Sequence, residues 1–208
     1  MSAPRPTSAP RPSDLLLEGL SALVTEGSAA ASKLRRAVSV FADGEIAMTE
    51  TLRWGWHAGF AASAVWDEGS QHQVLSRQLQ SARDAGVLVD LPFCLHSLGF
   101  VTAWCGDLAL AGSLIAEAEA IAEATGTRLA RTAAALLAGL RGKEAEASAL
   151  IEVERRNAAA AGLGLGLQIF QWASGILYNG LGRYEQALVK AQRASEPAGA
   201  RHLRVCAR

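Results

Sequence analysis

The sequence has few aromatic residues and no excess of charge of either sign. Phe, Trp and Tyr make up 6% of the 208 residues, and 20 basic side chains balance 20 acidic ones, for a formal net charge of zero. A β-sandwich is normally richer in aromatic and β-branched residues, and a nucleic-acid-binding domain normally carries a basic patch. The composition therefore favours helices that pack through small side chains, and we expect no direct binding of nucleic acid by this segment.

The chain also lacks the marks of a secreted or membrane-spanning protein. Its three cysteines, an odd number at irregular spacing, do not form a disulfide framework. The first residues have no apolar core of the kind that signal peptides contain. The longest apolar run, around 133–140, is far shorter than the roughly 20 residues of a membrane span. We therefore expect a cytoplasmic protein that makes no membrane contact.

Proline is concentrated near the N-terminus. Four of the six prolines lie within the first 12 residues, with Ser, Ala and two Arg between them. Such a segment favours an extended polyproline II conformation. We expect a disordered leader over residues 1–13, which serves either as a plain linker or as a ligand for a proline-recognising domain. Ser13 stands where a helix N-cap belongs, with Asp14 in the first turn. At the other end, residues 197–208 are expected to form an irregular basic tail.

Between these ends, residues 14–196 repeat the pattern of a helical hairpin. Apolar and small residues recur at steps of three and four, as on one face of an α-helix. Five glycines mark the expected turns, at spacings of 42, 37, 36 and 40 residues: Gly27, Gly69, Gly106, Gly142 and Gly182. A tetratricopeptide repeat has a period of about 34 residues. The pattern predicts an all-α fold, a tetratricopeptide-like right-handed superhelix of five helical hairpins.

The last hairpin, over residues 169–195, shows this pattern most clearly. Its first helix places Ile169, Ala173 and Ile176 on one face. The facing stripe of its second helix is predicted to contain Tyr184, Ala187, Leu188, Ala191 and Ala194. The run YNGLGRYEQA at 178–187 resembles the turn of a tetratricopeptide repeat. That resemblance implies a stack of hairpins that binds or regulates other molecules and seldom catalyses.

A larger resemblance covers nearly the whole chain. The segments at 14–38, 52–70 and 172–188 are similar to the middle region of actinobacterial LuxR-type transcriptional regulators related to the maltose regulator MalT. Those proteins combine an N-terminal P-loop ATPase, a helical-repeat middle and a C-terminal helix-turn-helix. A Walker A loop requires G-x-x-x-x-G-K-[ST], and the nearest strings, at 27–34 and 142–144, do not match it. The resemblance implies a fragment, namely a sensor or assembly segment without its ATPase and DNA-binding ends.

The best candidate binding site is a cluster of aromatic residues in one predicted helix. Trp54, Trp56, His57 and Phe60 lie within seven residues, and Trp66 follows in the same predicted helix. These aromatic residues would form a platform for a ligand or peptide in the groove of the repeat stack. In the alternative interpretation, Trp56 and Phe60 pack between repeat units while Trp54 half-covers an edge. Both alternatives stay open at the level of sequence.

Other polar patterns do not predict chemistry. Cys94 and His96 are two positions apart and would point about 200° away from each other on a helix, so together with Cys105 they do not form a metal site. The glycines at 162–166 lack the spacing and the βαβ context of a dinucleotide loop and are interpreted as a flexible link. Seven glutamates have no nucleophile, histidine or metal ligand at a spacing that would support catalysis: Glu117, Glu119, Glu123, Glu144, Glu146, Glu152 and Glu154. We expect no metal, no cofactor and no catalytic residue.

The sequence therefore predicts a non-catalytic interaction and regulatory module. The leading hypothesis is a segment of a LuxR-type regulator that binds a partner protein or a small inducer. The alternative is a free-standing tetratricopeptide scaffold that binds a partner protein or peptide. Apolar residues near one end, Leu16, Leu17 and Leu20, are expected to support self-association if they are exposed.

Overall fold

The computed structural model describes residues 10–195, and every regular element in this range is a helix. The helices are α1 (Pro12–Glu26), η1 (Gly27–Ala30, a 3₁₀ helix), α2 (Ala31–Asp43), α3 (Met48–Ala64), α4 (Glu68–Asp84), α5 (Leu91–Trp104), α6 (Leu108–Thr125), α7 (Thr132–Leu140), α8 (Glu144–Ala160), α9 (Gly164–Gly180) and α10 (Tyr184–Ser195). The predicted all-α fold is confirmed. The right-handed superhelix stays a prediction.

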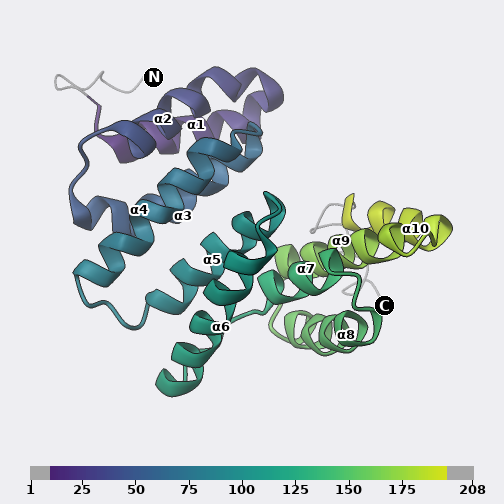
Figure 1. Ribbon diagram of the computed structural model, residues 1–208. Helices are drawn as coiled ribbons and strands as arrows, with labels where there is room; N and C mark the ends of the chain where they lie inside the picture. Colours follow the sequence, from purple (N-terminus) through teal and green to yellow (C-terminus); the bar gives the residue numbers. More distant parts are fainter. Residues whose placement is uncertain (1–9, 196–208) are drawn as a thin grey trace. The chain divides into compact units, whose positions relative to one another are not determined.

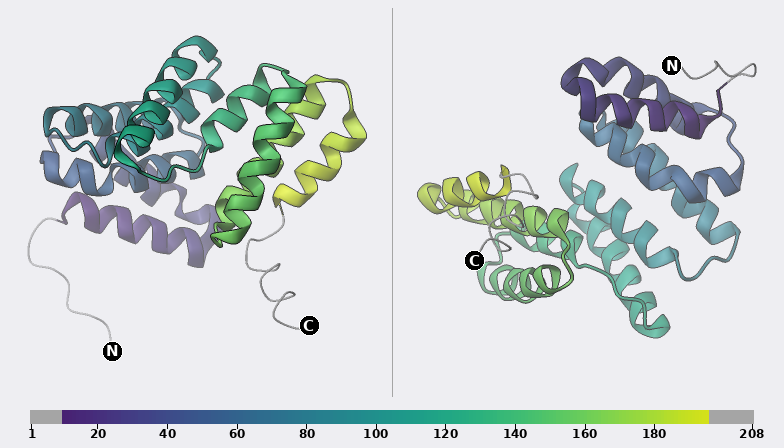
Figure 2. Two further views of the ribbon diagram at one scale, coloured as in Figure 1. Left: turned by 90° about the horizontal axis from the view of Figure 1, so that it is seen from below. Right: turned by 180° about the vertical axis from the view of Figure 1, so that it is seen from behind.

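The chain divides into two compact units at Val101, within α5. In the first unit, α1 contacts α2 and α3 contacts α4, and α2 also contacts both α3 and α4 (Figure 1). In the second unit, α7 contacts α8 and α9, and α9 lies along α10, as both views in Figure 2 show. Four of the predicted hairpins are therefore present as pairs of contacting helices. Over residues 10–195, no helix has both the length and the apolar content that crossing a bilayer requires.

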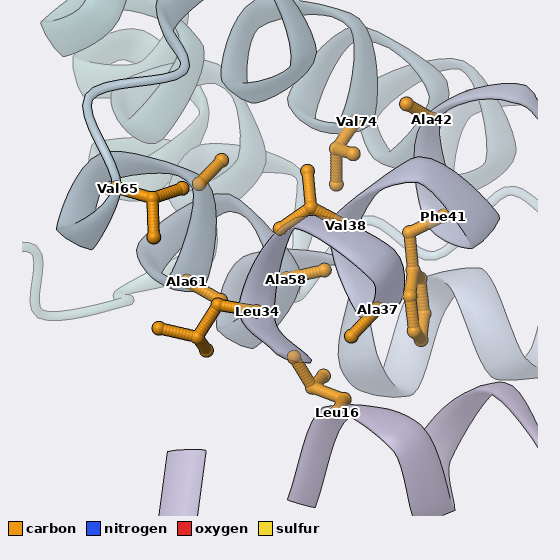
Figure 3. Packing of buried hydrophobic residues seen from close by; sticks show 11 residues of the cluster. Leu16, Leu34, Ala37, Val38, Phe41, Ala42, Ala58, Ala61, Val65 and Val74 are labelled. Carbon is orange, nitrogen blue, oxygen red and sulfur yellow. The ribbon is translucent and has the colours of Figure 1, made fainter. Parts of the chain in front are cut away.

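The core of the first unit forms around one face of α2. Leu34, Val38 and Phe41 project from this helix toward Leu16 of α1 and Ala58 of α3 (Figure 3). Burial of each large apolar side chain contributes about 1.5–3 kcal/mol, so this cluster stabilises the contacts among the first four helices. The expectation that Leu16 belongs to an exposed self-association surface is wrong, because Leu16 is fully buried in this core.

Of the three leucines expected to support self-association, only one is exposed. Leu17 is exposed and Leu20 is half-buried. Successive helix positions are separated by about 100°, so the burial of Leu16 against α2 turns Leu17 away from the core. A three-leucine surface does not form at this end.

The core of the second unit is built from one aromatic ring and many small side chains. Phe170, Ala173 and Leu177 of α9 pack among residues of α7 and α8, which include Ala135, Ala138, Ala147, Ile151 and Ala158. The predicted stripe of α10 is correct for Ala187, which is buried, but wrong for Tyr184, Leu188 and Ala191, which are exposed. The reason is a close approach. A Cβ on Gly175 would lie 3.6 Å from the Ala187 carbonyl oxygen, so α10 packs on α9 through a narrow strip of small residues.

The hairpin turns use left-handed backbone conformations. Four of the five predicted turn glycines have positive φ, at positions 27, 106, 142 and 182. The fifth prediction is wrong, because Gly69 lies inside α4 and the turn centres on Trp66, whose φ is +56°. Asp67 explains the shift: its carboxylate accepts a hydrogen bond from the Ser70 N–H at 3.1 Å, so it caps α4 at the N-terminus. The Asp67 N–H in turn bonds to the Ala62 carbonyl at the end of α3.

The first helix begins earlier than predicted. Arg11 is the N-cap of α1 and Pro12 its first residue, so Ser13 is not the cap. Asp14 is in the first turn, as predicted, and accepts a hydrogen bond from the Arg11 N–H at 3.1 Å. The Ser13 N–H donates instead to Glu50 Oε1 of α3, at 3.2 Å. The predicted leader up to residue 9 and the predicted tail at 197–208 lie outside the described residues.

The glycine-rich stretch at 162–166 is not a link throughout. Gly162 forms the turn after α8, with φ of +69°, whereas Gly164 and Gly166 lie in the first turn of α9. The interpretation as a link is therefore wrong for Gly164 and Gly166, which are helical. A Cβ on Gly166 would lie 3.6 Å from the Ala158 Cβ, so its small size suits the packing of α9 on α8.

Candidate functional site

The aromatic residues of α3 are not among the residues that pack on α4. The face that packs on α4 consists of small residues, and a Cβ added at Gly55 would approach the Gln78 side chain to 2.9 Å. At Gly59 an added Cβ would approach Leu75 Cδ2 to 3.0 Å. Large rings do not fit at this distance. The local sequence therefore places small residues inward and the rings outward.

Five rings form what we call the aromatic surface: Trp54, Trp56, His57, Phe60 and Phe93. Trp56 is at the centre. Its ring stacks on Phe60, with centroids 6.1 Å apart and planes at 22°, and meets the edge of His57 at 5.1 Å. Phe93, from the first turn of α5, lies 5.8 Å from Trp56. Such pairs each contribute about 0.5–1.5 kcal/mol beyond area burial, so the rings hold one another in place.

The rings remain accessible despite these contacts. Phe60 is 44% exposed and Phe93 is 42% exposed. Trp54 is half-buried and packs partly against the core of the first unit. Trp56 thus contacts rings of both α3 and α5, while Phe60 and Phe93 stay partly exposed. The role of the cluster as a binding platform stays a prediction.

Phe93 is the member of the surface that the sequence interpretation missed. The helical spacing gives no signal for it, because α3 and α5 begin at Met48 and Leu91, whereas Phe60 lies late in α3 and Phe93 lies in the first turn of α5. Trp66, by contrast, lies in the turn after α3 and is 80% exposed, away from the ring contacts of this surface.

One cationic side chain contacts the aromatic surface. The Arg53 guanidinium carbon lies 5.6 Å from the centre of the Trp54 ring, a cation–π contact. Trp54 is also 5.5 Å from His57. The surface can therefore offer flat ring faces, one guanidinium and one imidazole to a ligand, which suits binding by stacking.

The two chemistry-bearing residues of α5 point inward. Cys94 is buried, and this burial raises the pKa of its thiol to about 11, with a smaller contribution from Asp90. His96 is also buried, and desolvation lowers its pKa to about 4. Cys105, after α5, is exposed. Within residues 10–195, no three His, Cys, Asp or Glu side chains gather as metal ligands would.

The glutamates of the second unit are partly engaged in ion pairs. Glu144, at the start of α8, forms a two-pronged pair with Arg183, with one N–O distance of 3.0 Å. Glu119 of α6 accepts a hydrogen bond from Arg131 at 2.7 Å, which raises the pKa of that arginine. Glu152 pairs with Arg155 one turn later in α8. These contacts join neighbouring segments, and an exposed pair of this kind contributes about 0–1 kcal/mol.

A separate feature lies where α2 meets α3. It is an open cleft of about 770 Å³ lined by Asp43, Gly44, Glu45 and Arg77, among others. The Arg77 guanidinium donates hydrogen bonds to the carbonyls of Phe41, Ala42 and Gly44. Because these are the unpaired carbonyls at the C-terminus of α2, the arginine caps a helix here. The aromatic surface remains the better candidate site.

Comparisons with protein-family models, with curated proteins and with solved structures gave no match. The case for a function therefore depends on the residues and contacts described above.

Proposed function

We propose that this chain is a non-catalytic helical-repeat module that binds a partner protein or peptide through its aromatic surface. The observation that carries the proposal is the exposure of Phe60 and Phe93 beside Trp56. Soluble proteins usually bury large rings, and contiguous exposed apolar patches mark interaction sites. Aromatic residues are also the side chains most enriched in the energetic centres of interfaces.

The biological setting that we propose is transcriptional regulation in the cytoplasm. The resemblance of segments 14–38, 52–70 and 172–188 to LuxR-type regulators supports a role as their sensor or assembly segment. In that setting a partner or a small inducer acts by binding one state of the whole regulator better than another. A free-standing tetratricopeptide scaffold is the alternative. The DNA around the reading frame distinguishes the two, because coding sequence for a P-loop upstream and for a helix-turn-helix downstream favours the regulator.

The test is capture of partners with matched surface variants. We would compare the wild-type chain with the double variant Phe60→Ala/Phe93→Ala and with Trp66→Ala as the control. All three should fold, because the three rings are 42–80% exposed. We expect a partner that binds the wild type and the Trp66→Ala variant equally well. Its affinity for the double variant should be lower by about tenfold or more. A partner that binds all three equally would refute the assignment of the surface.

A further inference from the structure

The N-terminal leader joins the folded chain next to the aromatic surface. The Ser13 N–H donates to Glu50 Oε1 at 3.2 Å, and α1 contacts α3. Glu50 lies in the first turn of α3, one turn before Arg53 and Trp54. The residues that precede Pro12 therefore start beside the helix that carries four of the five rings.

The leader is long enough to cover the surface. Ten residues separate Glu50 from Phe60, which is about 15 Å along an α-helix. Residues 2–10 would span about 28 Å in a polyproline II helix. Arg11, at φ −69° and ψ 157°, already has this conformation. The chain thus enters α1 from the backbone geometry that proline-rich ligands adopt.

The chemistry of the leader matches that of the rings. Proline-rich segments bind grooves lined by aromatic side chains, because the preformed polyproline helix loses little entropy and its rings pack flat on aromatic faces. The leader carries Pro4, Pro6 and Pro10, separated by small residues and by Arg5. An arginine guanidinium also stacks on aromatic rings, as Arg53 already does on Trp54.

We propose that residues 2–10 of the leader bind the aromatic surface of their own chain and that an external partner must displace them. This inference rests on the proposed function, since it names the ligand chemistry of the same surface: prolines spaced by small residues and arginine. A short tether gives an effective concentration in the millimolar range, so even a weak contact competes with a partner. The leader then acts as a built-in competitor that sets a threshold for partner binding.

The experiment compares indole N–H resonances in ¹⁵N NMR spectra of the full chain. The leader variant replaces Pro4, Pro6 and Pro10 by Ala. Expected is a change in the Trp54 and Trp56 resonances with no change at Trp66. The same leader change in a Phe60→Ala/Phe93→Ala background should then move the two resonances much less, since coupled sites are not additive. A synthetic peptide of residues 2–12, added to the leader variant, should shift both resonances back toward their wild-type positions.

Three results would overturn the inference. The first is that the Trp54 and Trp56 resonances do not move when the prolines are replaced. The second is that they move equally in the wild-type and Phe60→Ala/Phe93→Ala backgrounds. The third is that their positions depend on protein concentration, which would assign the surface to a second copy of the chain.

Partner affinity separates this failure from failure of the proposed function. The leader variant should bind the captured partner about two to ten times more tightly than the wild type does. Equal affinities, with binding still lost in the Phe60→Ala/Phe93→Ala variant, would leave the proposed function standing and refute the leader as competitor. Binding that is insensitive to both changes would refute both.

Discussion

Replacing Trp66 with glycine is expected to stabilise the protein, although it removes a large aromatic side chain. Trp66 has φ of +56° in the turn between α3 and α4, where the other left-handed residues described in the chain are glycines. The left-handed conformation costs an L-residue about 1–2 kcal/mol. Glycine avoids this cost but adds about 0.5–1 kcal/mol of unfolded-chain entropy. Because Trp66 is 80% exposed, little burial is lost, and the net gain should be about 0.5–1 kcal/mol.

The measurement is thermal unfolding followed by circular dichroism. A gain of this size should raise the Tm by about 1–4 °C in a chain of 208 residues. Trp66→Ala is the matched control, because it removes the same indole but keeps a side chain at positive φ; it should leave the Tm nearly unchanged. The converse change, Gly182→Ala at φ +73° with open space around it, should lower the Tm. Equal gains for Trp66→Ala and Trp66→Gly would refute the argument from backbone strain, since the indole itself would then be the destabilising group.

Three further predictions follow from packing and titration. Gly139→Ala should destabilise the protein by about 1–3 kcal/mol in urea unfolding, because the new Cβ would lie 2.9 Å from the Ala173 carbonyl oxygen. The control Gly180→Ala, where an added Cβ meets nothing within 4 Å, should change the free energy of unfolding by about 0.5 kcal/mol or less. Leu34→Ala, at a fully buried position, should cost about 3–5 kcal/mol and lower the urea midpoint without changing helix content in water. Burial lowers the pKa of His96 from 6.5 to about 4, so the unfolded chain binds its proton first as the pH falls. The free energy of unfolding should be nearly constant above about pH 7.5 and about 2 kcal/mol lower at pH 5. A His96→Gln variant that loses as much over this range would contradict the assignment.

The helices could be predicted because their signals are local. The spacing of apolar and small residues marks a helix wherever it repeats every three or four positions, and glycine marks a turn where the backbone needs positive φ. Both signals are strong at Gly106, Gly142 and Gly182, and the structure places all three in left-handed turns. The error at Gly69 is also local. The prediction places the turn at this glycine, although Asp67 two residues earlier carries the side chain that caps α4.

The aromatic surface was predicted only in part, because its membership depends on contacts between helices. The sequence identifies four of its rings, since they lie within seven residues of one another. Phe93 joins them only when α5 is placed beside α3. Whether the rings face inward or outward was likewise undecided from the helical spacing alone, because both faces of α3 carry apolar residues.

What the sequence by itself determined is the helical character of the chain, most helix ends and the residues that form the turns, because these depend on interactions within a few positions along the backbone. The tertiary structure decided which face of each helix is buried. Gly55 and Gly59 of α3 leave room for the Gln78 and Leu75 side chains of α4, so this face of α3 has no space for the rings of Trp56 and Phe60. That choice depends on how the side chains of two different helices fit together, which the residues of one helix do not fix alone.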